Sequence, residues 1–396
     1  MVKEYCTGTY VIDNEYAQIW CIEYPYADSL DYCYGGTRTV VPEMEDENVY
    51  DRISYLGVYE SGLKNVLIND MIQDGTFDEL AGRLPDGFLR SSVGGGRCLI
   101  QPKNESNLEA ILNMDDDRNK EILASIFNDL GAFLNDKNGS LKLTPDFGRY
   151  AGLADLLHEH TNNVLGINCD DGGCGGKASY TSTGIIQAAE SMGAKKDVPM
   201  TIIGAAGACG CGVVDYFINK GYGNLAVCDL YYDNSHGGGV ETERLKAKGV
   251  KVLKSEDGKF TDECLSRGGI IIATTVGGEF LNSNNVAIKD GTILLLAHNE
   301  CIHVCEEDYK AVDDLLSKRD ITVVPGQLLT FGGALTSRIE WFYRENKTGE
   351  YFDKPLAHDA VKKASDAVMK KYCIDSAREN LFRKIYDMAE DRMAIN

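Results

Sequence analysis

A series of short apolar runs in the second half of this chain, separated by helical stretches, limits its fold more than any other feature. Each run is three to six residues long, too short for an independent helix. Short buried runs that alternate with helices are typical of a parallel sheet covered on both faces. The sequence therefore predicts an α/β unit built on six strands, at residues 200–204, 225–229, 251–253, 269–274, 292–297 and 321–324.

The first of these runs leads into a glycine-rich segment and then a helical one. Glycines let a backbone approach a pyrophosphate, and a helix N-terminus offers N–H groups and a positive dipole end. The next run ends in Asp229, where a carboxylate can accept hydrogen bonds from ribose hydroxyls and repel a 2′-phosphate. The alternative is a tight strand–helix turn without a ligand. We predict a dinucleotide site that favours NAD over NADP, with glycines at Gly204, Gly207, Gly210 and Gly212.

A length of 396 residues exceeds what one hydrophobic core usually serves, so two domains are expected. Before the parallel-sheet half, the pattern predicts a strand over 16–24, helices over 63–72, 108–133 and 151–160, and a glycine-rich turn over 93–97. Residues 168–177 have the composition of a loop or hinge. From residue 337 the chain is expected to be helical. The predicted boundaries are 1–165, 166–335 and 336–396.

Charge and cysteine usage restrict the partners. A formal net charge of −21 repels phosphate backbones and anionic lipid, so we expect neither nucleic acid nor membrane as a partner. No apolar run of membrane-spanning length and no secretory pattern occur. The thirteen cysteines are scattered, which favours reduced thiols in a cytoplasmic protein. The pairs Cys169/Cys174 and Cys301/Cys305 lack a second zinc-like pair, so no metal site is predicted.

Residues 324–341, V-P-G-Q-L-L-T-F-G-G-A-L-T-S-R-I-E-W, carry a family resemblance. They resemble the segment of glutamate, leucine, phenylalanine and valine dehydrogenases that reads V-P-D-x-x-x-N-A-G-G-V-x-x-S-x-x-E-W. Six further pieces are similar to motifs of that family: G-G-x-R, M-T-Y-K-N-A, L-G-G-G-K, T-A-E-D-V-G, T-A-x-G and A-A-N. They occur in the family's order and span most of the chain, at residues 35–38, 62–65, 93–97, 143–148, 181–184 and 297–299.

The resemblance implies a fold class and a chemistry. The fold would be α/β, with an N-terminal mixed α/β domain for substrate binding and oligomerisation and a Rossmann-type dinucleotide-binding domain. C-terminal helices would pack back on the first domain. The chemistry would be NAD(P)-dependent oxidative deamination of an amino acid, reversible as reductive amination of a keto acid or imine. Members of this family usually form homo-oligomers.

Site residues follow from the matched motifs. Lys64 matches the lysine that binds the substrate carboxylate, and Asp146 matches a buried aspartate that shares proton transfers with a catalytic lysine. Arg97 occupies the position of that lysine. The resemblance assigns substrate binding to Tyr34, Gly35, Gly36, Arg38, Thr330 and Ser337. It assigns cofactor binding to Thr181, Gly204, Gly207, Ala208, Gly210, Asp229, Thr274, Thr275 and Asn299.

The departures from the family pattern include positions that have catalytic roles in the family. Arginine does not deprotonate near neutral pH, so Arg97 cannot move a proton as lysine does. Thr330 and Gly326 replace the family's asparagine and aspartate, and the gap after Lys64 is longer than in the family. Three interpretations stay open. Another group, such as a lysine from the longer gap or Lys103, supplies the base; or the substrate is altered, for example an imine; or the chain is a silent homologue that binds a nucleotide or metabolite.

The substrate is only hinted at by two side chains. Tyr34 stands where glutamate-specific members carry a lysine, and a phenol suits an apolar, aromatic or hydroxylated side chain better than an acidic one. Ser337 stands where glutamate enzymes carry serine, which points the other way. We therefore expect a substrate other than glutamate. Two residues also have plain structural interpretations, because Asp146 could cap a following helix and Arg38 could be only an ion-pair partner.

Overall fold

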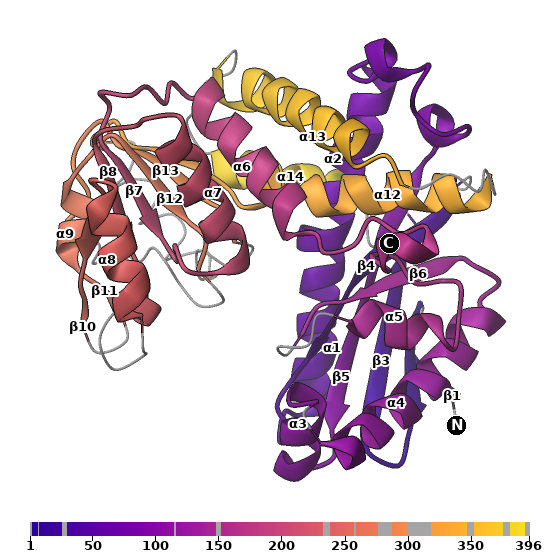
Figure 1. The fold of residues 1–396 in the computed structure, drawn as a ribbon. Coiled ribbons are helices and arrows are strands. Elements are labelled where there is room, and N and C mark those ends of the chain that lie inside the picture. Colours follow the sequence, from indigo (N-terminus) through magenta and orange to yellow (C-terminus); the bar gives the residue numbers. More distant parts are fainter. Residues whose placement is uncertain are drawn as a thin grey trace. The chain divides into compact units, whose positions relative to one another are not determined.

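The computed structural model describes residues 2–6, 8–25, 30–114, 116–147, 152–232, 238–256, 259–275, 287–298, 318–346, 352–374 and 381–392. The chain divides into two compact units (Figure 1). The first unit comprises Met1–Lys177, Ala334–Ala357 and Tyr386–Asn396, and the second comprises Ala178–Gly333 and His358–Ile385.

A six-stranded mixed sheet forms the frame of the first unit. Its order is β1-β2-β3-β5-β4-β6. Strand β5 runs antiparallel to β3 and parallel to β4, and β4 is also parallel to β6. The strands are β1 (Val2–Cys6), β2 (Thr9–Asp13), β3 (Ala17–Tyr24), β4 (Tyr32–Thr39), β5 (Val93–Pro102) and β6 (Leu141–Pro145).

The glycine-rich stretch 93–97 lies inside strand β5, so the predicted turn is wrong. All ten residues of β5 are buried, and the strand lies between β3 and β4 in the sheet. The glycines serve close packing here: a Cβ on Gly35 would lie 1.5 Å from the carbonyl oxygen of Gly96, and one on Gly95 would lie 2.6 Å from that of Gly57. Glycine inside a strand often marks such a close approach.

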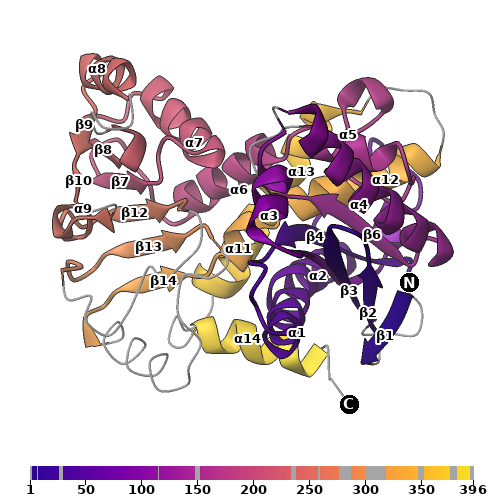
Figure 2. The ribbon, with the colours of Figure 1, turned by 90° about the horizontal axis from the view of Figure 1, so that it is seen from below.

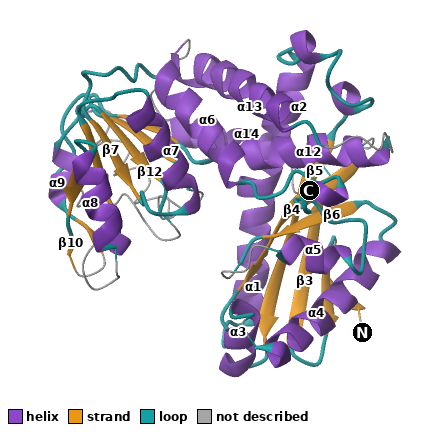
Figure 3. Ribbon diagram, in the orientation of Figure 1, coloured by secondary structure: helices purple, strands orange, loops and turns teal. Residues whose placement is uncertain are grey.

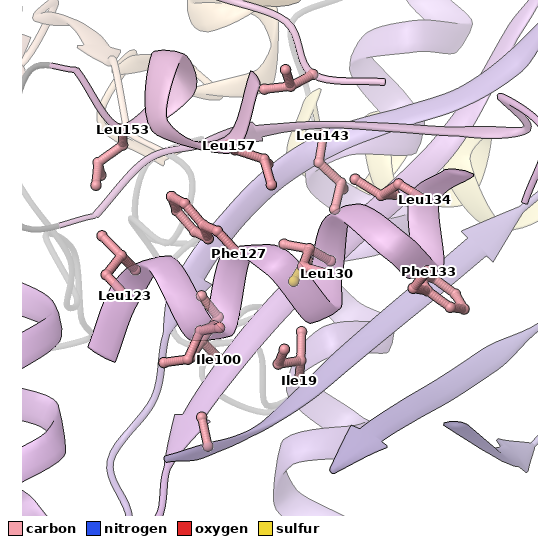
Figure 4. Packing of buried hydrophobic residues seen from close by; sticks show 14 of the residues in the cluster. Ile19, Ile100, Leu123, Phe127, Leu130, Phe133, Leu134, Leu143, Leu153 and Leu157 are labelled. Carbon is pink, nitrogen blue, oxygen red and sulfur yellow. The ribbon is translucent and has the colours of Figure 1, made fainter. Parts of the chain in front are cut away.

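The main core of the first unit lies between one face of the sheet and helix α4 (Asp117–Asp136). Apolar residues of α4 recur at helical spacing from Ile122 to Leu134, so one stripe of the helix is buried. Figure 4 shows Phe127 and Leu130 of this stripe near Ile19 and Ile100 of the sheet. The predicted single helix over 108–133 is two helices, α3 (Glu105–Leu112) and α4, because Asp116 caps the start of α4 by accepting a hydrogen bond from the Arg118 N–H.

The opposite face of the same sheet carries α1 (Asp46–Tyr55), the π-helical segment η1 (Leu56–Gly62) and α2 (Leu63–Gln73). Trp20, Ile22 and Leu99 of the sheet pack there against the start of this continuous helical run. Tyr32 and Tyr34 pack near Trp341 of α12 (Gly332–Glu345). The remaining elements of this unit are η2 (Asp78–Leu80), η3 (Phe88–Arg90), α5 (Leu153–His158) and η4 (Cys169–Asp171).

The second unit contains the predicted parallel sheet. Its order is β14-β13-β12-β7-β8-β9, and every pairing is parallel. In chain order this is 3-2-1-4-5-6, the arrangement of dinucleotide-binding sheets, which reverses direction between β7 and β12. Figure 2 shows β7, β12, β13 and β14 side by side. The strands are β7 (Met200–Ile203), β8 (Leu225–Cys228), β9 (Lys251–Leu253), β12 (Ile270–Ala273), β13 (Ile293–Leu296) and β14 (Thr322–Val324).

Helices accompany both sheets, so each unit is mixed α/β (Figure 3). Among the described residues, no helix is long and apolar enough to cross a membrane. The second unit contains α6 (Ala178–Ser191), α7 (Ala208–Asn219), η5 (Leu230–Tyr232), α8 (Gly239–Ala247), the hairpin β10 (Ser255–Glu256) and β11 (Lys259–Phe260), α9 (Asp262–Ser266), α11 (Gln327–Thr330) and the π-helical η7 (Met369–Ile374). Helices α13 (Lys354–Val368) and α14 (Leu381–Arg392) each have residues in both units.

Candidate active site

Glu60 is the centre of a charged cluster on the helix-covered face of the first unit's sheet. It lies in η1, one turn before Lys64 of α2. Its Oε2 is 3.2 Å from Nη1 of Arg97 on β5, and its Oε1 is 3.6 Å from both Nζ of Lys64 and Nη2 of Arg38. Three sequence-predicted residues, Arg38, Lys64 and Arg97, therefore meet at a carboxylate that the sequence analysis did not identify.

Strand register brings these side chains to one face. Alternate residues of a strand point to the same side of a sheet, so Tyr34, Gly36 and Arg38 share a face of β4. A Cβ on Gly36 would lie 3.1 Å from Nη1 of Arg97, so this glycine leaves space for the guanidinium. A Cβ on Gly35 would lie 1.5 Å from the Gly96 carbonyl oxygen and 2.7 Å from Oγ of Ser61. Both predicted glycines thus shape the cluster through the backbone.

The cluster carries more positive than negative charge. The three cations face two carboxylates, Glu60 and Asp146, with Oδ2 of Asp146 3.9 Å from Nη2 of Arg38. Burial alone would raise the pKa of Glu60, but Arg97, Arg38 and Lys64 outweigh it and lower that pKa to about 2. Burial lowers the pKa of Lys64, with Glu60 opposing the shift and the two arginines adding to it. Glu60 is therefore a permanent anion at neutral pH.

Arg97 is a buried guanidinium with open donors. Its side chain is only 2% exposed, and Nη1 faces Glu60. Nε and Nη2 have no hydrogen-bond partner among the residues that the structure describes. A buried donor without a partner carries a desolvation cost of about 1–3 kcal/mol, more for a charged group. Two neighbouring N–H groups of a guanidinium fit a carboxylate in a bidentate fashion, so the arrangement can hold an anionic ligand.

Asp146 differs from the buried aspartate that the resemblance implies. Its side chain is 74% exposed, and its backbone N–H donates to the carbonyl of Thr37. It does not cap α5, which begins after Gly152 without a side-chain cap. In this structure Asp146 therefore borders the cluster through Arg38.

A second polar group lies beside the cluster, at the positions predicted to line the side-chain pocket. The Tyr34 hydroxyl donates to Oγ of Ser337 at 2.8 Å. Nζ of Lys177 donates to the Tyr34 hydroxyl at 2.9 Å and to Oγ1 of Thr144. Thr144 of this group pairs with Gly36 across β6 and β4, and Gly36 borders the guanidinium of Arg97.

Glu60 and Lys177 are the two site residues that the sequence analysis missed. For Glu60 the available signal was its position four residues before Lys64, where opposite charges meet on a helix. Lys177 ends the glycine-rich stretch that was interpreted only as a loop or hinge. That stretch is anchored by Glu340, whose carboxylate accepts hydrogen bonds from the N–H groups of Gly166 and Cys174.

The predicted cofactor residues of the second unit gather at the sheet's reversal point, where β7 ends. Gly204 has a φ of +78°, which side chains rarely adopt, and a Cβ there would lie 2.8 Å from the carbonyl carbon of Thr274. A Cβ on Gly210 would lie 2.2 Å from the Gly204 carbonyl oxygen, so this glycine permits α7 to approach the turn. Oγ1 of Thr274 donates to the carbonyls of Ile203 and Gly204.

Asp229 follows β8 and holds the same turn. Its Oδ2 accepts the N–H of Ala206 at 2.9 Å, and its Oδ1 accepts that of Tyr231. Gly207 precedes the first turn of α7, which starts at Ala208. This glycine-rich cradle before a twelve-residue helix, with an acid after the next strand, fits the pyrophosphate and ribose of a dinucleotide.

The other predicted residues are placed less directly. Thr181 lies on α6, whose Ser182 donates to the carbonyl of Cys209 in α7. Thr275 is the residue after Thr274, with its N atom beside Gly204. Thr330 belongs to the second unit, where its hydroxyl donates to the Gly326 carbonyl, whereas the Glu60 cluster belongs to the first unit. Asn299 lies outside the described residues.

Comparisons with known proteins find similar structures but no matching family model and no curated protein of matching sequence. The fold is similar to that of L-tryptophan dehydrogenase from Nostoc punctiforme, with a TM-score of 0.61 and 15% identity over 96% of this chain and 92% of that chain. It is also similar to a hetero-hexameric glutamate dehydrogenase from Thermus thermophilus, with a TM-score of 0.64 and 15% identity over 95% of this chain and 83% of that chain.

A third similar structure is a glutamate dehydrogenase from Peptoniphilus asaccharolyticus, with a TM-score of 0.59 and 14% identity over 96% of this chain and 86% of that chain. At these identities the likeness concerns the fold, and it extends over nearly the whole chain. The chain therefore has the fold of the amino acid dehydrogenases, a mixed α/β domain together with a Rossmann-type domain.

Proposed function

We propose that this protein is an NAD(P)-dependent dehydrogenase that oxidises the CH–NH₂ group of an amino acid or a related amine. The observation that carries the proposal is the buried guanidinium of Arg97, which has two open donors in a net positive cluster. An α-amino acid brings the carboxylate that such a group lacks. The dehydrogenase fold and the glycine cradle at Gly204 and Gly210 support the same conclusion.

The proposed roles follow from the contacts. Arg97 binds the substrate carboxylate through Nε and Nη2, while Glu60 fixes Nη1 and the orientation of the guanidinium. A dinucleotide would be held by the turn at Gly204, Gly207 and Gly210 and by Asp229, whose carboxylate favours NAD over NADP. A dinucleotide held there would supply a nicotinamide as the acceptor for hydride from the substrate α-carbon. The remaining cofactor residues would be Thr181, Ala208, Thr274, Thr275 and Asn299.

The polar group around Tyr34 would meet the substrate side chain. It contains two hydroxyls, of Tyr34 and Ser337, and the ammonium of Lys177. These groups can donate to a hydroxyl, amide or carboxylate on the substrate.

A second candidate is a catalytically silent homologue that binds a nucleotide and a carboxylate metabolite. Two observations favour it: Arg97 stands where the resembled family has its proton-transferring lysine, and Asp146 is exposed. Binding would then be retained without turnover.

An assay for nicotinamide reduction separates the two candidates. The protein is mixed with NAD or NADP and a panel of L-amino acids and amines, and the absorbance band of the reduced nicotinamide is followed. We expect reduction with at least one amino acid and a higher kcat/KM with NAD than with NADP. Binding of NAD without reduction by any member of the panel would support the silent homologue. The Arg97→Met variant is expected to raise the KM for the amino acid.

A further inference from the structure

The Glu60 cluster must contain a group that moves protons if the proposed deamination occurs. The arginine at position 97 cannot do so near neutral pH. On the basis of the proposed function, we infer that the two positively charged side chains facing Glu60 have exchanged roles: Lys64 carries the proton, and Arg97 anchors the substrate carboxylate. The exchange would keep one lysine and one carboxylate-binding cation in the site, each at the other's position.

Geometry distinguishes the two cations. Lys64 is 8% exposed, and its Nζ is 3.6 Å from the Glu60 carboxylate, beyond ordinary hydrogen-bond distance. Its amine makes no hydrogen bond with the residues that the structure describes, so loss of its proton breaks none of those contacts. Arg97 lies closer to Glu60, at 3.2 Å, and its Nε and Nη2 have no hydrogen-bond partner among the described residues. Glu60 thus holds the guanidinium more tightly than the amine.

The surroundings of Lys64 lower the pKa of its ammonium. Burial disfavours the ammonium and lowers its pKa; Glu60 and Asp146 oppose the shift, whereas Arg38 and Arg97 add to it. A lowered pKa makes a lysine a better general acid–base group than an exposed lysine at the same pH. Arg38 and Arg97 therefore add to the effect of burial on the pKa of Lys64.

The other candidate bases fit less well. The segment between Lys64 and Gly94 contains no lysine, so the longer gap cannot supply one. Lys103 lies beyond the end of β5, with its Nζ 3.0 Å from Oδ1 of Asp13. Lys177 is tied to Tyr34 and Thr144; burial lowers its pKa, but contact with Tyr34 and Cys174 raises it on balance. Of the lysines considered, Lys64 is therefore the one whose amine lies in the Glu60 cluster and can act as the base.

The proton steps balance at Nζ of Lys64. The substrate ammonium first releases one proton to solvent, and loss of hydride from the neutral amine would then leave an iminium at the α-carbon, with a bound nicotinamide dinucleotide as the hydride acceptor. The neutral amine takes a proton from water as the C–O bond forms, and the resulting ammonium gives that proton to the substrate nitrogen. The C–N bond then breaks, ammonia leaves with the bonding electron pair, and the hydroxyl proton passes to Nζ as the carbonyl forms. Lys64 releases this last proton to solvent.

The test compares variants at the two positions. Lys64→Met is expected to lower kcat by about 10²- to 10⁴-fold, the usual range for loss of a general acid–base group. Lys64→Arg keeps the charge and is expected to lose kcat as well, because arginine does not release a proton. Arg97→Met is expected to raise the KM of the amino acid by about 10- to 100-fold, with a smaller loss of kcat. Lys142→Met is the matched control, since it removes another buried lysine of the same sheet, outside the cluster.

The ionisation of Lys64 gives an independent readout. Reductive methylation with ¹³C-formaldehyde labels lysine amines, and comparison with Lys64→Met assigns the Lys64 signal. We expect that signal to titrate below those of exposed lysines, and the ascending limb of kcat with pH to follow it and to vanish in both Lys64 variants. An unperturbed titration, or a Lys64→Arg variant that retains kcat and the same pH limb, would overturn the exchange of roles.

Failure of the inference is distinct from failure of the proposed function. Suppose that the wild-type protein reduces the nicotinamide with an amino acid, and that circular dichroism shows Lys64→Met to be folded. If this variant then retains the wild-type kcat, the inference is wrong and the proposed function stands. If the wild-type protein turns over no amino acid, the proposed function fails, and the inference that rests on it is rejected as well.

Discussion

Glu60 shows how a residue can organise a site without leaving a clear motif. The resemblance assigned roles to Arg38, Lys64 and Arg97, and the structure brings these three side chains together. Their common partner lies in a π-helical segment, and such segments are frequent at functional sites but have no simple sequence periodicity. The cations could therefore be predicted from the family resemblance, whereas the only sequence signal for the anion was its position four residues before Lys64.

The low pKa of Glu60 makes stability depend on pH in a defined window. The cations lower the pKa from an ordinary value of 4.5 to about 2, so the carboxylate stabilises the fold above pH 4.5 by ~3 kcal/mol. This contribution is lost as pH falls from 4.5 towards 2. Urea unfolding followed by circular dichroism between pH 5 and 3 measures it.

Two variants control that measurement. Glu60→Gln is expected to flatten the pH dependence between 5 and 3 and to destabilise the fold at pH 7, because cations are left buried without their partner. Glu243→Gln, which removes an exposed carboxylate, is expected to leave both unchanged. A pH dependence equally steep in Glu60→Gln and the wild-type protein would contradict the account.

Lys177 is a second residue whose role depends on tertiary structure. It donates to the Tyr34 hydroxyl, and Tyr34 donates to Ser337. Lys177→Met is expected to lower the preference for substrates with a hydrogen-bond acceptor on the side chain over apolar ones, by about 10- to 100-fold in the ratio of kcat/KM, the value of one charge-assisted hydrogen bond. Kinetics with paired substrates of similar size measure the ratio. An unchanged ratio would show that the substrate side chain lies elsewhere.

At the scale of elements, glycine has two different uses in this chain. In strand β5 the glycines permit close contact with β4 and η1, and sequence patterns misassign them as a turn because composition does not show what packs against them. Around Gly204 the strand–turn–helix order was predictable, because the apolar run, the glycines and Asp229 follow one another at the spacing that dinucleotide sites require.

A substitution that adds one methyl group tests whether the close contact between helix α7 and the turn after β7 is needed for NAD binding. Gly210→Ala would place a Cβ 2.2 Å from the Gly204 carbonyl oxygen, so the helix must shift away from the turn. We expect NAD affinity, measured by calorimetry, to fall by at least about 10-fold, given the cost of overpacking of 1–3 kcal/mol. Gly239→Ala, with open space around its Cβ, is the control and should bind NAD normally. Equal NAD affinities in both variants would show that the turn does not take part in cofactor binding.

At the scale of the whole molecule, the two-unit α/β architecture was predictable because periodicity distinguishes the parallel sheet from the mixed one. All six predicted strands of the second unit are present and parallel. The first unit was less predictable, since its β5 and the break between α3 and α4 depend on packing and capping. Location in the cytoplasm and assembly remain predictions.

Strand β1 supports the prediction of a homo-oligomer. It is the edge of its sheet, all its residues are exposed, and Val2 is 49% exposed. An open edge is a template for pairing with another strand. We expect light scattering after gel filtration to give a multiple of the chain mass, and Val2→Lys to weaken the assembly. Val41→Lys, which changes another exposed valine, is the control. A monomer at micromolar concentration would refute the prediction.

The central proposal is that this protein oxidises an amino acid with a nicotinamide dinucleotide and releases ammonium. The most direct measurement is the ratio of ammonium released to nicotinamide reduced when the protein is supplied with NAD and an amino acid. We predict a ratio of one, with both products lost together in Lys64→Met. Nicotinamide reduction without ammonium, or no reduction with any amino acid despite bound NAD, would contradict the account.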